Sequence, residues 1–153
     1  MALKDRRTGW LTARFHGAFR NILMLETLHA VVVPAYCLMP DHLHLISVGV
    51  SIDADQRLWA RAVRRRINCC LAPWQLQKQA FDHVLRPAEQ GRDAFAALTH
   101  YVIANPVRAC LTTQPTAWPY SGSCVPSLPD LDPRRCDFAD RWWQFWNQVV
   151  SVT

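Results

Sequence analysis

The sequence predicts an α+β domain in which helices pack on one antiparallel β-sheet. Three observations carry this prediction. Apolar residues recur at helical spacing in several segments, and runs rich in β-branched and aromatic residues lie between these segments. The chain has 153 residues, which suits one domain of about 100–150 residues. Half of the residues are hydrophobic, so the chain can form a core and is not of the disordered class.

The first predicted elements are a helix and a β-hairpin. Thr12 to His29 has apolar residues near the i, i+3, i+4, i+7 spacing, with its first residue as N-cap. Ala30 to Leu38 is predicted as a buried strand, in which Pro34 requires an edge position or a bulge. After a short turn, His42 to Val48 begins with strict alternation, which is typical of a strand with two different faces. These two strands are expected to pair as a hairpin.

The later elements follow from the same periodicities. Asp53 to Leu71 fits a helix with an arginine-rich polar surface, and residues 79–86 have a strand-like apolar pattern. Residues 93–104 return to helical spacing. Ser121 to Pro133 is rich in Ser, Pro and Gly and is predicted as a loop, after which residues 138–149 form an aromatic-faced terminal helix.

The order of these elements predicts a particular α+β topology. With a strand before the first helix, the order is βαββαβ, a ferredoxin-like split βαβ arrangement with an antiparallel sheet and helices on one face. Only Met1 to Lys4 are available for that first strand, so it is expected to be stunted or missing. Residues 1–120 are expected to form this domain, and residues 121–153 a loop and a helix packed on it.

The charge and the termini limit the classes of function. Lys and Arg number 17 against 12 Asp and Glu, a net charge of +5, which favours a polyanionic partner. The stretch from Thr27 to Pro40 lacks Asp, Glu, Lys and Arg but is shorter than the roughly 20 residues of a membrane span, and it contains Pro34. The first ten residues have no signal-peptide pattern, so the cytoplasm is the expected location.

Two pairs of residues have spacings that suit a catalytic site. His42 and His44 lie two apart in a predicted strand, so both imidazoles project from one face and can converge on one cation. Tyr101 and Asn105 lie four apart in a predicted helix and share one face. Other interpretations stay open: exposed strand histidines are common, Tyr101 suits a partly buried aromatic, and Asn105 before Pro106 suits an N-cap.

Together these residues lie in segments that resemble a known family. The chain resembles the transposases of the IS200-like Y1 superfamily, and in particular the REP-associated tyrosine transposases. The resemblance runs from about Trp10 to Ser121. It rests on four segments in consistent order: YCLMPDHLHL at 36–45, FDHVLR at 81–86, YVIANPVRA at 101–109 and WPYS at 118–121. The first segment ends in MPDHLHL, and the third has the pattern YxxxNPVRA. The two motifs together are more specific for the family than either motif alone.

The resemblance implies a metal-dependent transposase domain in residues 1–120. In the family, a ferredoxin-like domain holds an HUH motif that binds a divalent cation, which maps onto His42 and His44. The family's nucleophilic tyrosine maps onto Tyr101, with Asn105 as the third metal ligand. Such enzymes cut single-stranded DNA beside hairpins and rejoin it through a 5′-phosphotyrosine. Two imidazoles and an amide oxygen suit Mg²⁺ or Mn²⁺ better than thiolate ligands, which are typical of zinc sites, would.

A phosphotyrosine mechanism agrees with the rest of the sequence. The phosphodiester is exchanged rather than hydrolysed, so strands are rejoined without ATP, and the chain has no GxxxxGK phosphate loop. Arginines are expected to hold the DNA phosphates, although those of the 53–71 helix also suit a solvated helix face. The predicted DNA-binding residues are Arg57, Arg61, Arg64, Arg65, Arg66, Arg86 and Arg108.

Three functions therefore remain open. The first is an active DNA strand transferase, which the presence of His42, His44, Tyr101 and Asn105 favours. The second is a catalytically impaired or domesticated protein that binds DNA hairpins without turnover, which the short first strand favours. The third is a metal-dependent phosphodiesterase that uses water and does not need Tyr101. The expected partner is single-stranded DNA with hairpin or palindromic elements, with no membrane, and the sequence does not distinguish a monomer from a homodimer.

Overall fold

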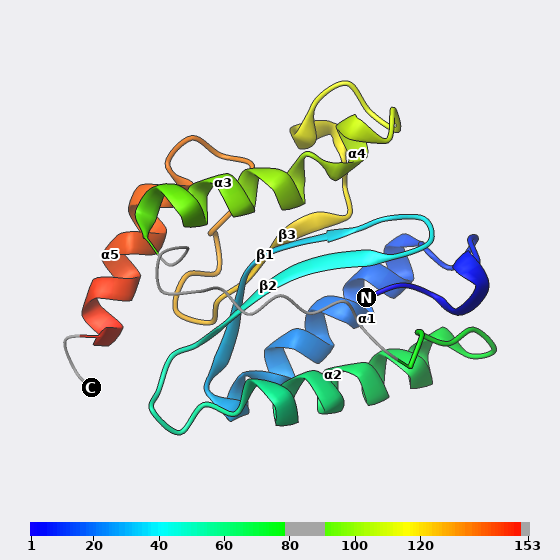
Figure 1. Cartoon of the computed structure of the whole chain (residues 1–153), viewed down its shortest axis with the longest axis horizontal. Coiled ribbons are helices and arrows are strands. Elements are labelled where there is room, and N and C mark those ends of the chain that lie inside the picture. Colours follow the sequence, from blue (N-terminus) through cyan, green and yellow to red (C-terminus); the bar gives the residue numbers. More distant parts are fainter. Residues whose placement is uncertain (79–90, 151–153) are drawn as a thin grey trace.

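The computed structural model describes residues 1–78 and 91–150, and it has the predicted α+β architecture. Its three-stranded sheet has the order β2-β1-β3, with β1 (Val31–Leu38) at the centre. Both neighbours, β2 (Leu43–Gly49) and β3 (Ser121–Cys124), pair with β1 in the antiparallel direction. The predicted hairpin of two adjacent strands is confirmed (Figure 1).

Helices cover both faces of this sheet. In Figure 1, α1 (Ala13–Leu25) and α2 (Gln56–Leu71) lie on one side, and α3 (Arg92–Ile103) and α5 (Phe138–Val150) lie on the other. The expectation that all helices share one face is wrong. The physical reason is that β1 is apolar on both faces and all eight of its residues are buried, so each face needs its own helical cover.

Side chains of β1 alternate between the two cores, and the strand has a bulge at the predicted place. Val31 and Val33 belong to the core with α1 and α2, and so do Tyr36 and Leu38. The residues that face this core thus have odd numbers before Pro34 and even numbers after it. The change coincides with a register shift between Val32 and Ala35, a stretch that includes Pro34. Because β1 is central, proline is tolerated there through the bulge and not through an edge position.

The same alternation fixes which way β2 presents its side chains. Leu43 packs in the core with α1 and α2, whereas Ile46 packs in the core with α3 and α5. Successive residues of a strand point to opposite faces. His44 therefore shares the α3 side of the sheet with Ile46.

Residues 1–3 lie beside the start of β2 and form isolated β-bridges instead of a full strand. Ala2 forms an antiparallel bridge with His42, and Leu3 forms one with Leu76. The Leu43 amide donates to the Met1 carbonyl at 2.7 Å, and the Gln77 amide donates to the Ala2 carbonyl at 2.8 Å. The first strand is therefore reduced to these bridges, in agreement with the expectation that it is stunted or missing, and backbone groups of residues 1–3 are paired on both sides.

The loop predicted at 121–133 is wrong over its first four residues, which form the buried strand β3. Serine, glycine and cysteine have little intrinsic preference for strands, so the local sequence predicts a loop. Tertiary packing requires small residues here, because a Cβ on Gly122 would lie 2.8 Å from the Tyr36 hydroxyl. The predicted strand at 79–86 lies outside the described residues.

The helix boundaries follow side-chain caps. The Thr12 hydroxyl accepts from the Phe15 amide at 3.1 Å, as predicted. Asp55 caps α2 by accepting from the amides of Arg57 and Leu58, so this helix begins three residues later than the sequence pattern suggests. Three short elements complete the set: η1 (Lys4–Arg6), η2 (Glu26–His29) and η4 (Pro115–Ala117), and α4 (Asn105–Arg108) directly follows α3.

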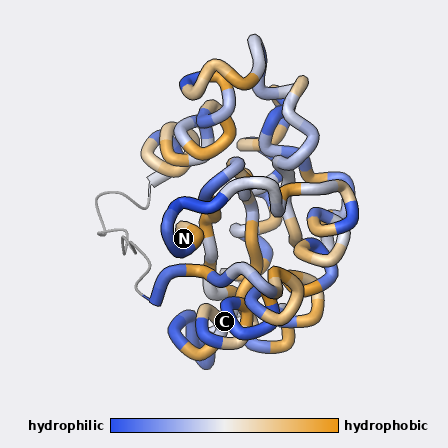
Figure 2. Tube along the Cα trace, turned by 90° about the vertical axis from the view of Figure 1, so that its right-hand side faces the viewer, coloured by the Kyte–Doolittle hydropathy of each residue, from blue (hydrophilic) through white to orange (hydrophobic). Residues whose placement is uncertain are grey.

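Each helical layer is amphipathic. In Figure 2, viewed along the layers, the coils above and below the strands carry both hydrophobic and hydrophilic stretches. Apolar side chains of α1 and α2 face the sheet, and the predicted aromatic face of α5 packs through Phe138 and Trp142 on the core shared with α3. Among the described residues, no helix combines the length and the hydrophobicity needed to cross a bilayer.

Candidate active site

The start of β2 places two imidazoles against each other. His42 Nε2 and His44 Nε2 are 3.0 Å apart, and the ring centroids are 4.8 Å apart. The intervening Leu43 points into the opposite core and is only 1% exposed, which anchors this stretch of the strand. The two histidines therefore share one face of the sheet, as their spacing predicts, and their Nε2 atoms converge.

Asp41 orients the first of these imidazoles, a role that the sequence analysis did not find. Its Oδ1 lies 2.6 Å from His42 Nδ1, and its Oδ2 accepts from Arg6 Nη1 at 3.0 Å. A carboxylate accepts hydrogen bonds, so His42 carries its proton on Nδ1 and directs the lone pair of Nε2 toward His44. The signal for this role in the sequence is a carboxylate directly before an HxH motif, in the short turn between the two predicted strands.

Electrostatics keep this group of residues in the form that suits a metal ligand. Although partial burial acts to raise it, the hydrogen bond to His42 and the charge of Arg6 hold the pKa of Asp41 below its ordinary value. Burial, followed by the charge of His42, lowers the pKa of His44 to about 4. His44 is therefore a neutral imidazole at pH 7, with a lone pair on one of its ring nitrogens.

Helix α3 brings Tyr101 to the same place from the other side. The Tyr101 and His44 ring centroids are 6.0 Å apart, with the rings nearly perpendicular at 87°. Phe95 and Val102 bury the sheet-facing side of α3, which leaves Tyr101 at its margin and 47% exposed. A phenol that is both beside the histidines and open to solvent can be reached by a large substrate.

Arg108 completes the group from α4. Its Cζ lies 4.8 Å from the centroid of the Tyr101 ring, a cation–π arrangement. The short α4 begins directly after α3, so its last residue turns back over the ring. Of the predicted DNA-binding arginines, Arg108 is the one that the described structure places against Tyr101.

Asn105 lies at the break between α3 and α4. Its side-chain nitrogen donates to the carbonyls of Tyr101 at 2.8 Å and Val102 at 3.2 Å. The N-cap interpretation does not apply, because the residue at the N-cap position of α4 is Ala104. Asn105 instead binds the C-terminal end of α3 and thereby holds the backbone of Tyr101. Since its nitrogen is committed, its oxygen is the atom available as a ligand.

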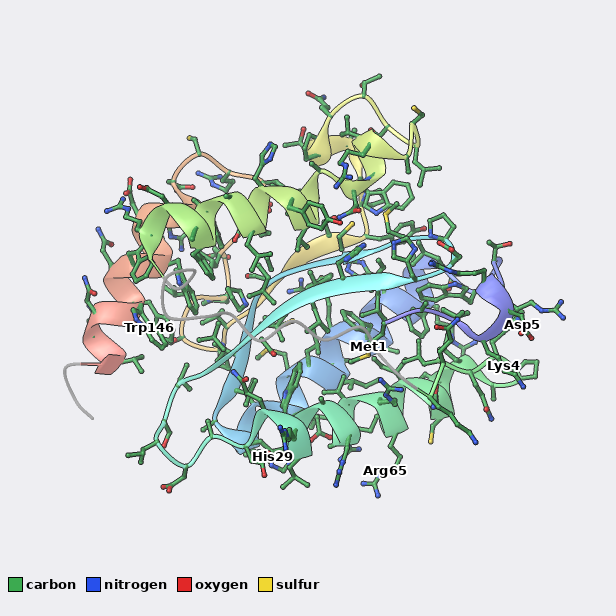
Figure 3. All side chains as sticks on the ribbon, viewed as in Figure 1. Met1, Lys4, Asp5, His29, Arg65 and Trp146 are labelled. Atoms are coloured by element: carbon green, nitrogen blue, oxygen red, sulfur yellow. The ribbon has the colours of Figure 1, made fainter. Side chains whose placement is uncertain are left out.

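The arginines of α2 occupy a different layer. Helix α2 packs on the sheet face opposite α3, and Figure 3 shows Arg65 projecting from α2 away from the sheet. Arg61, Arg64 and Arg65 line a shallow cavity of about 500 Å³ on this helix. Arg66 pairs with Glu26, a carboxylate whose side chain is only 5% exposed. The predicted cluster is therefore divided between exposed cations and cations that the fold engages, of which Arg66 is one.

The other two predicted DNA-binding residues are placed as follows. Arg57 is exposed in the first turn of α2, where its amide donates to the Asp55 cap. Arg86 lies outside the described residues. Arg64 also donates to the Lys78 carbonyl at 2.6 Å and to the Gln77 carbonyl, so it ties α2 to the chain that follows it.

The two histidines suit a divalent cation. Two neighbouring ligands of an octahedral Mg²⁺, each ~2.1 Å from the ion, are about 3.0 Å apart. The Nε2 atoms of His42 and His44 have this separation. Within the described residues, no group of three or more His, Cys, Asp or Glu converges on one point. In the described part of the chain, the further protein ligand that the resemblance implies is the side-chain oxygen of Asn105.

Comparisons with known proteins bear on the fold. No protein-family model matches the sequence, and no curated protein matches it either. A solved structure does match, that of the REP-associated tyrosine transposase bound to a REP hairpin. The TM-score is 0.63 with 23% sequence identity, and the match covers 78% of this chain and 71% of that chain. The resemblance detected in the sequence is thus confirmed at the level of architecture, and this chain has the fold of that transposase.

Proposed function

We propose that this protein cleaves and rejoins single-stranded DNA beside hairpins through a 5′-phosphotyrosine at Tyr101. The observation that carries the proposal is the placement of Tyr101 6.0 Å, ring to ring, from His44, within a fold shared with a hairpin-bound tyrosine transposase. A solvent-open phenol, a convergent imidazole pair and a neighbouring guanidinium are the groups that phosphoryl transfer to tyrosine requires.

In this proposal, different residues bind the cation and support the attack of Tyr101 on the phosphate. His42 and His44 would hold Mg²⁺ or Mn²⁺ together with the oxygen of Asn105, and the contact of Asp41 with Nδ1 of His42 would keep that imidazole in the required tautomer. When bound, the cation supplies polarisation of the scissile phosphate and stabilises the charge on its oxygens. Arg108 adds a fixed positive charge beside the attacking ring.

Cleavage exchanges one phosphate ester bond for another. The Tyr101 oxygen forms a bond to phosphorus and the bond from phosphorus to the 3′ oxygen breaks. Tyr101 loses its phenolic proton, and the departing strand end gains one as a 3′-hydroxyl. Attack of a 3′-hydroxyl on the phosphotyrosine reverses these events and joins strands, so no nucleotide cofactor is consumed.

Two features support activity over the binding-only alternative. The short first strand favoured that alternative because its absence would leave neighbouring backbone unpaired. Residues 1–3 instead hydrogen-bond on both sides, to β2 and to residues 75–77. Burial of His44 and the carboxylate on His42 also maintain a ligand-ready pair, which a protein that only binds hairpins does not need.

The test is formation of a covalent adduct. The protein is incubated with Mn²⁺ and a labelled library of single-stranded DNA hairpins with flanking tails, and the products are separated on a denaturing gel. We expect a protein–DNA adduct that is lost in Tyr101→Phe and retained in Tyr120→Phe, a tyrosine that instead packs against Trp118 and His16.

The other outcomes separate the competing functions. Cleavage without an adduct, or cleavage that survives Tyr101→Phe, would identify a water-dependent phosphodiesterase. Hairpin binding without any cleavage across the library, with Mg²⁺ as well as Mn²⁺, would identify a DNA-binding protein without turnover. Omission of the cation is expected to abolish the adduct while leaving the fold intact by circular dichroism.

A further inference from the structure

A cavity adjoins Tyr101, and neither His42 nor His44 is among its lining residues. It has a volume of about 420 Å³, within the range of ~300–1,000 Å³ that is usual for small-ligand sites. Its lining residues come mainly from α3 and α4, two helices that meet end to end in Figure 1. Its lining consists of Ala97, His100, Tyr101, Ala104, Val107, Arg108 and Pro115. The metal-binding and phosphate-exchange roles above leave this cavity without a function.

The lining suits a flat, weakly polar group. Four of its lining residues are small and apolar: Ala97, Ala104, Val107 and Pro115. The other three carry planar groups, the imidazole of His100, the phenol ring of Tyr101 and the guanidinium of Arg108. Among residues 1–78 and 91–150, no carboxylate lines the cavity, so these residues do not repel a ligand attached to a phosphate backbone.

The helix geometry shows why the cavity is open. Ala97, Tyr101 and Ala104 lie three and four residues apart, so they form one stripe along α3. The two alanines place only methyl groups on either side of the tyrosine. A longer residue at either position would fill the space next to the ring.

We propose that this cavity binds the unpaired base of the nucleotide next to the phosphate that Tyr101 attacks; this inference rests on the proposed function. The attacked phosphorus lies within bonding distance of the Tyr101 oxygen during attack, and the same ring forms one wall of the cavity. The base of an adjoining nucleotide is therefore the part of the substrate that can reach the cavity. Planar side chains and Arg guanidinium groups are what unpaired bases stack on.

The proposal assigns sequence preference at the cut to α3 and α4. The imidazole of His100 and the guanidinium of Arg108 present hydrogen-bonding groups in the lining, where they can meet the edge of the base. A base of the wrong shape leaves these polar groups unpaired, and an absent base leaves the apolar lining residues exposed. Selection of the cleavage point is then separate from recognition of the hairpin.

The first experiment measures which base is accepted. Hairpin substrates that differ only in the base on each side of the cut, together with abasic versions, are compared by the rate of adduct formation. We expect the wild-type protein to lose about tenfold or more on the abasic substrate at one of these positions. In Ala97→Leu, the preferred substrate is expected to react no faster than the abasic one, with hairpin affinity unchanged.

Two further variants serve as controls. Ala117→Leu makes the same substitution at an exposed residue outside the cavity lining, and it should retain the wild-type base preference. Val107→Phe fills the cavity from α4 instead of α3 and should reproduce the Ala97→Leu result. Equal reaction of wild type with the abasic substrates, or an unchanged base preference in both cavity variants, overturns the proposal.

A second measurement does not depend on cleavage. In Tyr101→Phe, 2-aminopurine is placed at each flanking position, and its fluorescence is recorded when the protein binds the hairpin. Stacking in the cavity should quench the signal at one position, and the Tyr101→Phe/Ala97→Leu protein should restore it. If the wild type forms no adduct, the proposed function fails while this measurement still decides the cavity, since absence of quenching at both positions overturns the base site.

Discussion

The carboxylate beside the histidine pair is the residue-scale feature with the most specific consequence. Asp41 accepts from both His42 and Arg6, and this double contact fixes the imidazole. In protein metal sites, such carboxylate partners set the tautomer of the ligand and raise its basicity. The proposed metal site therefore depends on a side chain that would not itself be a ligand of the cation.

Replacement of Asp41 by asparagine is expected to weaken metal binding by about 10–100-fold. An asparagine can donate to Nδ1 of His42 and so favour the tautomer with its proton on Nε2, which cannot bind a cation. The measurement is titration of Mn²⁺, followed by the free-ion electron paramagnetic resonance signal and by adduct formation.

The matched control for that titration is Asp53→Asn, an exposed carboxylate before α2. Saturating Mn²⁺ should restore adduct formation in Asp41→Asn, because Tyr101 and its neighbours are unchanged. An unaltered affinity for Mn²⁺ would show that the Asp41–His42 contact has no part in metal binding.

At the scale of elements, α2 carries arginines with two distinct roles. Arg65 is exposed and projects away from the sheet, as Figure 3 shows, and it lines the shallow cavity with Arg61. Arg66 binds the buried carboxylate of Glu26 in η2 and so joins two elements of the fold. Adjacent residues of one helix thus differ, because the guanidinium of Arg66 pairs with a buried carboxylate although half of its side chain is exposed.

Alanine substitutions should separate these roles. Arg65→Ala is expected to weaken hairpin binding and to reduce the slope of log K against log salt by roughly 0.7–0.9 for one lost phosphate contact, with thermal stability unchanged. Arg66→Ala is expected to cost about 1–3 kcal/mol of stability, because it removes the guanidinium from the buried Glu26 carboxylate and leaves that carboxylate with its contact to His29. Fluorescence anisotropy at several salt concentrations and thermal denaturation measure the two effects.

Other results would assign DNA contact to different residues of α2 or to none of them. If Arg66→Ala changed the salt slope and Arg65→Ala did not, the DNA-facing side of α2 would be the side toward η2. If neither variant changed hairpin affinity, α2 would be a solvated helix face, and the DNA would lie on the α3 layer alone.

At the scale of the whole molecule, buried polar contacts join the sheet to the segments around it. The Tyr36 hydroxyl in β1 lies 2.8 Å from His16 Nε2 and 3.0 Å from Arg20 Nη1 in α1, and burial raises the pKa of Tyr36 to about 12. Beyond β3, Arg134 binds Asp132 and the Trp118 carbonyl. Segments distant in sequence are therefore held together by a few hydrogen-bonded groups.

The Asp132–Arg134 pair predicts an acid-sensitive contribution to stability. Partial burial acts to raise the pKa of Asp132, but hydrogen bonds from the Arg134 side chain and backbone hold it below its ordinary value. A carboxylate with a lowered pKa in the folded state stabilises the protein above its ordinary pKa of about 3.9, and this contribution is lost as the pH falls through the lower folded value.

The measurement is the thermal midpoint as a function of pH. Wild type should exceed Asp132→Asn from neutral pH down to about pH 4, and the difference should shrink below that. Asp130→Asn, an exposed carboxylate in the same loop, is the control and should follow wild type. A difference between wild type and Asp132→Asn that stays constant down to pH 2 would contradict the assignment.

The sequence by itself determined the elements whose chemistry is local. Alternation in 42–48 and the cap at Thr12 follow from backbone geometry and nearest neighbours, and the structure has both. The same rules require an edge position or a bulge at Pro34, and the structure has the bulge. The same local rules placed His42 and His44 on one face and predicted the helix that carries Tyr101. Strand and helix periods need no knowledge of distant residues.

Only the tertiary structure decided what distant segments do to one another. Strand β3 forms from residues with little strand preference because β1 offers a partner and Tyr36 needs the space that Gly122 leaves. The packing of α3 against the sheet sets the 6.0 Å approach of Tyr101 to His44, and α4 brings Arg108 over the ring. The pairing of Arg66 with Glu26 and the cavity beside Tyr101 likewise arise from packing. Contacts across long sequence separations depend on the whole fold, so no local pattern encodes them.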